Sequence, residues 1–272
     1  ATGKGARLLS GCCAYSYGQE LKRGAMTLED FICKAVELRL DGVDMTAYYL
    51  KSTEPEYLDG LRHLAYKNAI PLSGSACGVS MVQASRAQRA DSVNEIKQWV
   101  DVTDRLGASH LRVFAGKLPS GHTLQEAIDW VVETMKAGCD YSGKKGITLG
   151  LEDHVGVSQS ADVCLEIMQR VNSPYAAINL DITNFIPTAT QDAYAQIAAC
   201  IPYASNTHIR DRFYDQTPVD LDRVWRLFAA AGFRGYMSAE YERSRANNEV
   251  AATGVPKLIA KIQALCRRYS GA

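Results

Sequence analysis

Short apolar runs alternate with longer amphipathic stretches along the whole chain. The apolar runs have the length of strands, and the stretches between them repeat apolar residues at helical spacing. Strands are expected at residues 8–14, 42–45, 70–77, 110–115, 147–152, 176–181, 204–209 and 236–240. Helices are expected at residues 27–40, 54–68, 86–106, 123–144, 160–171, 193–200, 221–231 and 250–269. The pattern therefore predicts strand–helix units in strict alternation.

Strict alternation of strands and helices indicates parallel strands with helices packed outside them. Eight such units over about 250 residues are typical of a closed (β/α)8 barrel, the TIM barrel of the α/β class. The alternative is an open doubly wound sheet, which has a glycine-rich loop after its first strand. Residues 8–17 contain a single glycine, Gly11, so the closed barrel is favoured. Because no linker or low-complexity segment divides the chain, residues 1–272 are expected to form one domain.

Local signals mark the ends of several predicted helices. Thr27 and Ser160 precede helical stretches, and such side chains accept hydrogen bonds from the first backbone N–H groups of a helix. Gly107, Gly146 and Gly232 follow helices, where glycine readily adopts the left-handed conformation that ends many of them. Longer loops are expected after the sixth and seventh strands, at residues 187–191 and 212–220.

Composition and charge count against several classes of partner. The chain has 30 Lys and Arg and 30 Asp and Glu residues, so its formal net charge is zero. This balance gives no electrostatic signature of a nucleic-acid partner or of binding to an acidic membrane surface. No apolar run approaches the roughly 18 residues that a membrane-spanning helix needs. We therefore expect neither a nucleic acid nor a membrane as partner.

The cysteines and the first residue add little about the compartment. The eight cysteines are scattered without a C-x-x-C pair, which favours buried free thiols over a zinc or redox motif. Vicinal Cys12 and Cys13 lie on a predicted strand, so they are expected to point to opposite faces. The chain starts at Ala1 rather than Met, which fits a processed precursor or an edited sequence.

Four residues of metal-ligand type stand at or near the ends of the last four predicted strands. They are Glu152, Asp181, His208 and Glu240, and successive members are separated by about one strand–helix repeat. Active-site groups of such barrels come from the carboxyl ends of the strands. We therefore expect these four side chains to form a ring at one mouth of the barrel.

The chemistry of this set indicates a metal site. Taken singly, each carboxylate could cap the next helix or pair with an arginine, and the histidine could be a hydrogen-bonded core residue. Three carboxylates that face one another would repel and be unfavourable to bury, and a divalent cation removes that penalty. Three carboxylates and one imidazole suit one divalent ion, namely Mn, Mg or Co, with Zn also compatible.

These residues and their neighbours resemble the xylose-isomerase-like barrel superfamily, which includes sugar isomerases and epimerases, inosose dehydratases and the endonuclease IV type. The resemblance covers nearly the whole chain. It is carried by residues 42–45, 112–116, 149–154 and 179–181, by Asn184 and Phe185, and by His208, Ala239 and Glu240. The set of ligands is fairly specific for the superfamily but not for one reaction within it.

The resemblance also implies a reaction. In the ketose 3-epimerase branch a Glu, an Asp, a His and a Glu on strands five to eight bind the metal, and both glutamates act as acid and base. These positions are Glu152, Asp181, His208 and Glu240 in this chain. The expected function is therefore that of a metal-dependent sugar isomerase or epimerase. Glu152 and Glu240 would be catalytic and would transfer a proton through a metal-held enediolate.

Two other functions stay open for the same residues. A leaving group β to the carbanion would turn the reaction into an elimination, as in a lyase, a dehydratase or an eliminative glycoside-cleaving enzyme acting on an oxidised sugar. A sugar-binding barrel without catalysis is the third hypothesis. The endonuclease IV type holds three zinc ions with many more histidine and acidic ligands. This chain has five histidines and no basic excess, so a DNA-repair role is not favoured.

The partner expected from the resemblance is a small-molecule sugar or sugar derivative. Candidate substrate-binding residues are His154, Arg210, Asn184, Arg112 and Tyr15. Asn184 stands where the ketose 3-epimerase branch usually has a histidine, and Arg210 and Arg212 are the nearest candidates for its arginine, so the substrate contacts are expected to differ. Residues 44–49 and 152–156 also resemble exported bacterial members. This favours a periplasmic protein with its signal removed over a cytoplasmic one. The oligomeric state is not predicted, and a homo-oligomer stays open.

Overall fold

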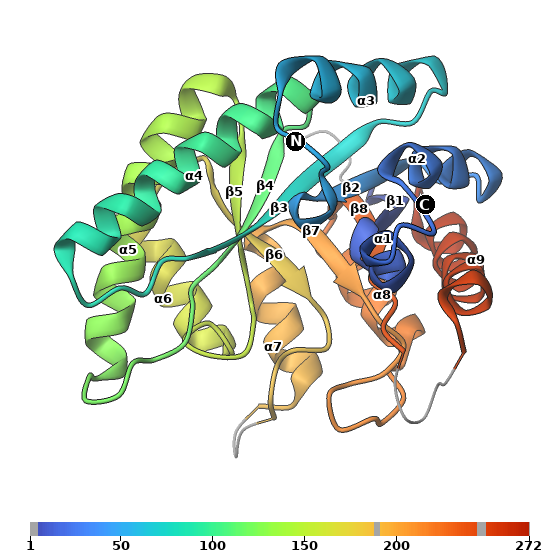
Figure 1. Cartoon of the computed structure of the whole chain (residues 1–272). Coiled ribbons are helices and arrows are strands. Elements are labelled where there is room, and N and C mark those ends of the chain that lie inside the picture. Colours follow the sequence, from blue (N-terminus) through green and yellow to red (C-terminus); the bar gives the residue numbers. More distant parts are fainter. Residues whose placement is uncertain (1–4, 188–190, 244–248, 272) are drawn as a thin grey trace.

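The computed structural model describes residues 5–187, 191–243 and 249–271. Within these residues eight parallel strands close in chain order into one barrel (Figure 1). The strands are β1 (Arg7–Cys13), β2 (Gly42–Thr46), β3 (Leu72–Ser80), β4 (His110–Phe114), β5 (Thr148–Glu152), β6 (Ala176–Asp181), β7 (Ala204–Ile209) and β8 (Arg234–Ala239). Because β1 pairs with β8, the predicted closed barrel is confirmed and the open sheet is wrong.

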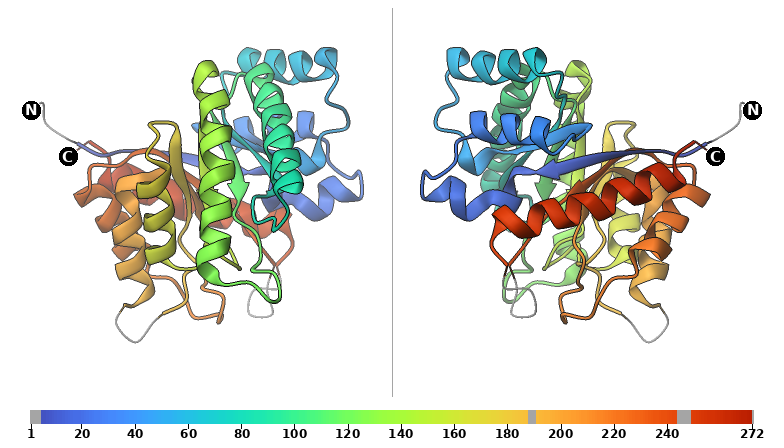
Figure 2. Two further views of the ribbon diagram at one scale, coloured as in Figure 1. Left: turned by 90° about the vertical axis from the view of Figure 1, so that its left-hand side faces the viewer. Right: turned by 90° about the vertical axis from the view of Figure 1, so that its right-hand side faces the viewer.

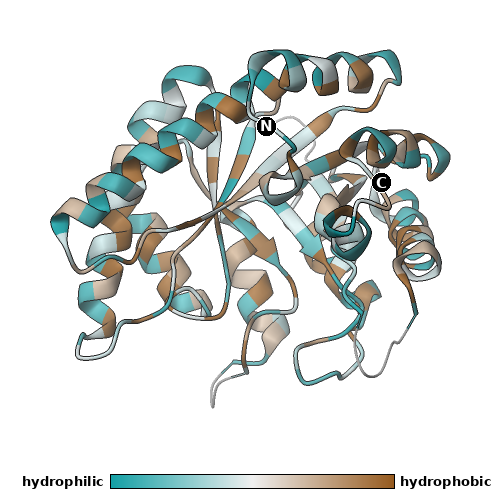
Figure 3. Cartoon of the chain, viewed as in Figure 1, coloured by the Kyte–Doolittle hydropathy of each residue, from teal (hydrophilic) through white to brown (hydrophobic). Residues whose placement is uncertain are grey.

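Helices surround the barrel (Figure 1), and all of them except the short α1 have buried apolar residues. Figure 3 shows that the same ribbons also carry hydrophilic residues. They are α1 (Gly18–Lys22), α2 (Leu28–Glu37), α3 (Pro55–Lys67), α4 (Arg86–Leu106), α5 (Leu124–Ser142), α6 (Ala161–Val171), α7 (Ala193–Cys200), α8 (Leu221–Ala230) and α9 (Ala251–Tyr269). In α8 the buried residues Leu221, Val224, Trp225 and Phe228 follow helical spacing and so share one face. Burying a large side chain of this kind contributes about 1.5–3 kcal/mol.

The predicted helix-end signals are confirmed. The Thr27 hydroxyl accepts a hydrogen bond from the backbone N–H of Asp30, and the Asp30 carboxylate accepts one from the backbone N–H of Thr27. Ser160 caps α6 by accepting from the backbone N–H of Val163. The three glycines adopt positive φ angles, of 75° at Gly107, 70° at Gly146 and 67° at Gly232. Most helix bounds therefore follow from local chemistry.

Three expectations about local structure need correction or lie outside the described residues. The third strand, expected at 70–77, starts at Leu72 and continues to Ser80, because Ser80 pairs with Phe114 of β4. The sequence pattern missed the short helix α1 and the 3-10 turn before it, at Ala14–Tyr17, since neither is long enough to show a helical period. The loop expected at 187–191 lies largely outside the described residues, while 212–220 connects β7 to α8.

The cysteines are free thiols, as expected, with one exception to their burial. Seven are buried, whereas Cys33 on α2 is exposed. Cys12 belongs to the hydrophobic core, while the Sγ of Cys13 lies 3.6 Å from the Thr46 hydroxyl of β2. Among the helices that the structure describes, none has both the length and the apolar character needed to cross a bilayer.

Three register shifts interrupt the barrel, and two of them occur beside polar side chains of its interior. Between β6 and β7, Ile178 faces Ala204 but Asn179 faces Asn206, so β7 carries an additional residue, Ser205. Between β2 and β3, a similar shift lies next to Asp44. Bulges of this kind change which face later side chains occupy. Beyond Ser205, Asn206 and His208 point into the barrel beside Asn179 and Asp181.

The two ends of the described chain meet at one end of the barrel (Figure 2). The backbone N–H of Gly271 donates to the carbonyl of Ala6 at 3.2 Å. The Ser270 hydroxyl accepts from the N–H of Leu8 at 2.8 Å and donates to its carbonyl at 3.0 Å. The end of α9 is therefore held against the start of β1.

Candidate metal centre

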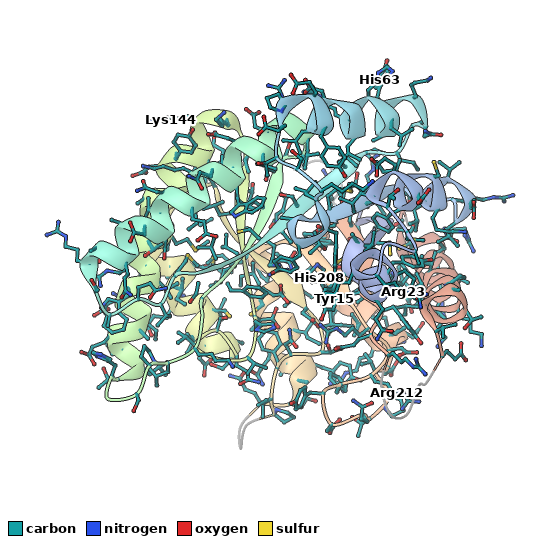
Figure 4. The ribbon with its side chains drawn as sticks, viewed as in Figure 1. Tyr15, Arg23, His63, Lys144, His208 and Arg212 are labelled. Atoms are coloured by element: carbon teal, nitrogen blue, oxygen red, sulfur yellow. The ribbon has the colours of Figure 1, made fainter. Side chains whose placement is uncertain are left out.

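The four ligand-type residues meet at the carboxyl ends of the strands. Glu152 and Asp181 are the last residues of β5 and β6, His208 is next to last in β7, and Glu240 follows β8 directly. All four are buried, and each offers one ligand atom within 4.8 Å of the others. Figure 4 shows His208 in the middle of the barrel, whereas His63 and Lys144 lie at its outer surface. The predicted ring of side chains is present.

The imidazole of His208 faces this ring with its Nδ1 atom. Nδ1 lies 3.0 Å from Glu240 Oε2 and 3.8 Å from Glu152 Oε1. The other nitrogen, Nε2, points toward β2, where it lies 4.0 Å from Asp44 Oδ2. The ring therefore presents one nitrogen to the carboxylates and turns the second to the barrel interior.

Asp181 is fixed by hydrogen bonds that occupy one of its two carboxylate oxygens. Its Oδ1 accepts from the backbone N–H of Thr183 at 2.8 Å and from the Thr183 hydroxyl at 2.7 Å. Its own backbone N–H donates to Asp153 Oδ1 at 2.7 Å. Oδ2 accepts no hydrogen bond of good geometry within the described chain, but it pairs with the Arg210 guanidinium at 3.1 Å and so is placed to face a cation.

Two arginines balance the carboxylates. Arg112 Nε lies 2.9 Å from Glu152 Oε2, and the Arg112 guanidinium carbon lies 3.9 Å from the centre of the Phe114 ring. Arg210 Nη2 lies 3.1 Å from both Asp181 Oδ2 and Glu240 Oε2. Arg210 Nη1 also contacts Glu242 at 3.1 Å. Each of these arginines therefore holds a carboxylate of the ring, in addition to any role toward a substrate.

Burial and neighbouring charges set the protonation of these groups. Burial alone would raise the pKa of Glu240, but His208 and Arg210 outweigh it and hold that pKa well below its usual value. Burial would lower the pKa of His208, but Glu240 raises it well above its usual value. Arg112 and His208 likewise outweigh burial and lower the pKa of Glu152. The pKa of Asp181 is raised, mainly by burial. Both glutamates are therefore ready to accept a proton or bind a cation.

The donor set fits one divalent ion. Two ligand atoms bound to the same ion at about 2.1 Å lie at most about 4.2 Å apart. The observed separations, up to 4.8 Å, are only a few tenths of an ångström larger. Three carboxylates and an imidazole suit Mn, Mg or Co, and Zn is compatible. Binding at Nδ1 would displace the proton of His208, so loading releases a proton.

The candidate substrate residues divide into those at the cavity and those away from it. A cavity of about 520 Å3 beside the ring is lined by Asn184, Arg210 and Glu240, among others. Tyr15 lies at a neighbouring hollow of about 210 Å3. His154 packs on Phe114 with 4.6 Å between ring centres. Arg112 is buried, with its Nη1 donating to the carbonyl of Cys77. Arg210 and Asn184 thus have the most direct access to this cavity.

Several polar residues near the ring were not predicted as site residues, although Asp44, Asp153 and Asn179 lie in segments that carry the family resemblance. They are Asp44, Asp153, Asn179, Asn206 and Glu242. Asn179 and Asn206 precede Asp181 and His208 by two positions, and residues two apart on a strand share a face. That spacing is the signal that could have found them. Asp44 gave a weaker signal, as a single carboxylate within an otherwise uncharged strand.

His110, at the start of β4, gives the stability of the metal-free protein a pH dependence. Burial lowers the pKa of His110 to about 4. The folded protein therefore keeps this ring neutral at pH values where an ordinary histidine of the unfolded chain, with a pKa near 6.5, takes up a proton. The free energy of unfolding should thus fall as the pH decreases from about 6.5 to about 4, and this contribution should stay constant below that.

We expect a His110→Leu variant to lose less stability than the wild type over this pH range, by up to about 3 kcal/mol. The measurement is urea unfolding of both metal-free proteins at about pH 7 and about pH 4.5. The carboxylates of the ring titrate in both proteins. Only the difference between the two losses of unfolding free energy therefore reports on His110. Equal losses in the two proteins would contradict the assignment.

A family model of the xylose isomerase-like TIM barrel matches residues 32–261. The chain belongs to the xylose isomerase-like TIM barrel family. The resemblance drawn from the sequence motifs is thereby confirmed. Membership in this family fits the order of the strands and the place of the ring at their carboxyl ends. No curated protein matches the chain in sequence.

Solved structures of similar fold include two epimerases crystallised with sugars and one probable dehydratase. D-allulose 3-epimerase from Methylomonas sp., in complex with D-allulose, is 18% identical, with a TM-score of 0.73 over 97% of this chain and 98% of the epimerase. D-psicose 3-epimerase from Clostridium cellulolyticum H10, with D-tagatose, is 12% identical, with a TM-score of 0.78 over 96% and 99%. The probable 3-DHS dehydratase AsbF from Bacillus anthracis is 14% identical, with a TM-score of 0.73 over 94% and 98%. At these identities the likeness shows the shared fold.

Proposed function

We propose that this family member is a divalent-metal-dependent isomerase or epimerase of a sugar or a close sugar derivative. The observation that supports it most is the buried ring of Glu152, Asp181, His208 and Glu240, whose ligand atoms lie within 4.8 Å of one another. Glu240 also lines the cavity of about 520 Å3, a size typical of small-molecule sites. Epimerases with D-allulose and D-tagatose among the structural neighbours support a sugar substrate.

The two glutamates would carry the proton transfers. A bound divalent ion would supply Lewis-acid polarisation of a substrate carbonyl. Glu152 and Glu240 enter the ring from β5 and from the end of β8, so they approach it from different sides. One would remove the proton next to the carbonyl, and the other would return a proton to the same carbon in an epimerisation or to the adjacent carbon in an isomerisation. Their lowered pKa values keep both ionised at neutral pH, which suits removal of the substrate proton. The glutamate that removes the proton becomes protonated and can return it, whereas the other glutamate must first take up a proton from water before it acts as the acid.

The arginines and Asn184 would orient these groups and the substrate. Arg112 contacts Glu152 and is enclosed by protein, so we assign it to hold that carboxylate. Arg210 joins Asp181 and Glu240 and also faces the cavity, where it could contact a substrate oxygen. The Asn184 side-chain amide donates to no acceptor in the described chain and can serve a substrate hydroxyl. His154 and Tyr15 remain candidates for contacts with the part of the substrate that lies farthest from the ring.

Proton exchange with solvent is the direct test of this function. We expect the manganese-, magnesium- or cobalt-loaded protein to incorporate deuterium from D2O into a ketose such as D-allulose, D-tagatose or D-fructose, or into an acidic or keto derivative, without loss of a leaving group. The measurement is NMR and mass spectrometry of a sugar panel, with protein treated with a chelator as the control. Absence of metal binding together with absence of exchange would contradict the proposal.

Elimination is the second candidate function, and the probable 3-DHS dehydratase among the structural neighbours favours keeping it. The same glutamate would remove the proton, but a hydroxyl or glycosidic oxygen on the next carbon would then leave. In the deuterium assay this reaction appears as a product that has lost water or an aglycone. Sugar binding with neither exchange nor elimination would instead indicate a binding protein.

A further inference from the structure

Below the ring, polar side chains of the barrel interior join in one hydrogen-bonded network. The Asn206 amide donates to Asn179 Oδ1 at 3.0 Å and to Asp44 Oδ2 at 3.2 Å. The Ser238 hydroxyl donates to Asn206 Oδ1 at 3.5 Å. These four residues come from β6, β7, β2 and β8, and all are buried. The network therefore fixes the Asp44 carboxylate from the far side of the barrel.

Asp44 is the charged acceptor that faces the inner nitrogen of His208. The distance from His208 Nε2 to Asp44 Oδ2 is 4.0 Å, about 1 Å longer than a charge-assisted hydrogen bond. Within the described chain, neither His208 Nε2 nor Asp44 Oδ1 has a hydrogen-bond partner. A buried N–H without an acceptor costs about 1–3 kcal/mol, so a small side-chain adjustment that joins these two groups is favourable. Cys13 also borders the imidazole, but sulfur is a weak acceptor.

We propose that Asp44 is a positioning residue that accepts the Nε2–H of His208 and so keeps the lone pair of Nδ1 directed at the metal. This inference rests on the proposed function, because it requires a cation in the ring. Histidine ligands commonly donate their second N–H to a carboxylate, which fixes the ring and its tautomer. Asp44 touches no ligand oxygen of the ring, so it would act on the metal only through His208.

The replacement Asp44→Asn distinguishes this role from simple packing, because it keeps the shape and changes the hydrogen bonding. In the proposed adjustment Asp44 Oδ2 keeps its hydrogen bond from Asn206, and Oδ1, which has no partner now, accepts from His208. An amide has one oxygen, and Asn206 already donates toward this position. The amide N–H2 would then face His208 Nε2 and favour a proton on Nδ1, the nitrogen that the metal needs free. We therefore expect metal binding to weaken by about 10- to 100-fold.

The experiment measures cobalt(II) binding to the whole chain by calorimetry and proton NMR of the cobalt-loaded protein. With one histidine in the ring, the wild type should show one strongly shifted N–H signal that disappears in D2O. In Asp44→Asn this signal should shift or exchange faster, and the affinity should fall by the stated factor. A merely structural role would lower thermal stability without changing this signal.

Two further variants keep the test decisive. Ser75→Ala, at a buried serine of β3 that bonds to Thr103 of α4, should retain the wild-type affinity and signal. Asn206→Ala keeps Asp44 but removes its donor, and should weaken cobalt binding by several-fold. If Asp44→Asn does not fold, Asn206→Ala takes its place as the test of the role of Asp44.

The outcomes separate this inference from the proposed function. A wild-type protein that binds no cobalt would contradict the metal-dependent function itself. A wild type that binds cobalt, together with an Asp44→Asn protein of equal affinity and unchanged N–H signal, would overturn the role of Asp44 alone. If only Asn206→Ala folds, an unchanged affinity and signal in that variant overturns it as well.

Discussion

Replacing Glu152 with glutamine should lower turnover by about 10²- to 10⁴-fold, the contribution of one general acid–base group. The amide cannot accept the substrate proton, whereas its oxygen and the three other ligands can still hold the ion. The effect should appear in kcat, since the lost interaction belongs to the transition state. The measurement is turnover of the substrate found by deuterium exchange, with bound metal determined by elemental analysis of the same samples.

The control for this replacement is Glu166→Gln on α6. Glu166 pairs with Arg170 at the surface and lies outside the ring, so its replacement should leave turnover unchanged. Because Glu152 also neutralises the buried Arg112, thermal unfolding should be recorded to confirm that the variant is folded. Near-wild-type turnover with metal still bound would exclude Glu152 as the base and leave Glu240 as the candidate.

The second large effect concerns Arg210, which stands between Asp181 and Glu240. An Arg210→Met replacement should lower the unfolding free energy of the metal-free protein by about 3–5 kcal/mol, because it leaves buried carboxylates without their partner. A divalent ion should restore much of this loss, since an ion at a thousand times its Kd stabilises the folded state by about 4 kcal/mol. Urea unfolding with and without manganese measures both quantities.

Arg170→Met is the matched comparison for Arg210. Arg170 also joins two carboxylates, those of Asp129 and Glu166, but its side chain is 37% exposed, against 21% for Arg210. Exposed pairs contribute about 0–1 kcal/mol, so this variant should lose little stability, and manganese should not change the difference from the wild type. If the metal-free Arg210→Met protein were as stable as the wild type, Arg210 would not be neutralising the carboxylates of Asp181 and Glu240.

Much of the fold follows from patterns that lie close together in the sequence. The bounds predicted for α4, β6, α7 and β7 agree with the structure. Apolar runs of strand length and apolar residues at helical spacing give the elements, and caps and glycines give their ends. The four ligand-type residues were predictable for the same reason, because alternation places the end of every strand at one mouth.

The rest of the site depends on distances that the sequence does not contain. Arg112 and Arg210 could have paired with nearby acidic residues such as Asp153 or Asp211, and the structure instead joins them to Glu152, Asp181 and Glu240. Those contacts depend on side-chain rotamers inside the closed barrel. Asp44 lies 4.0 Å from His208 because closure of the barrel brings β2 and β7 to face each other across its interior. Neither condition can be read from a local window of sequence.

The additional residue in β7 lets this strand hold two registers against β6. Before it, Ala204 faces Ile178, and after it, Asn206 faces Asn179 and His208 faces Asp181. Without Ser205, Asn206 would follow Ala204 directly and both would keep their present partners, so the imidazole of His208 would stay on the inner face. Loss of Thr207 would instead turn that imidazole to the outer face, since a slip by one residue exchanges the two faces of a strand. The strand therefore tolerates a change of length at one position and not two residues later.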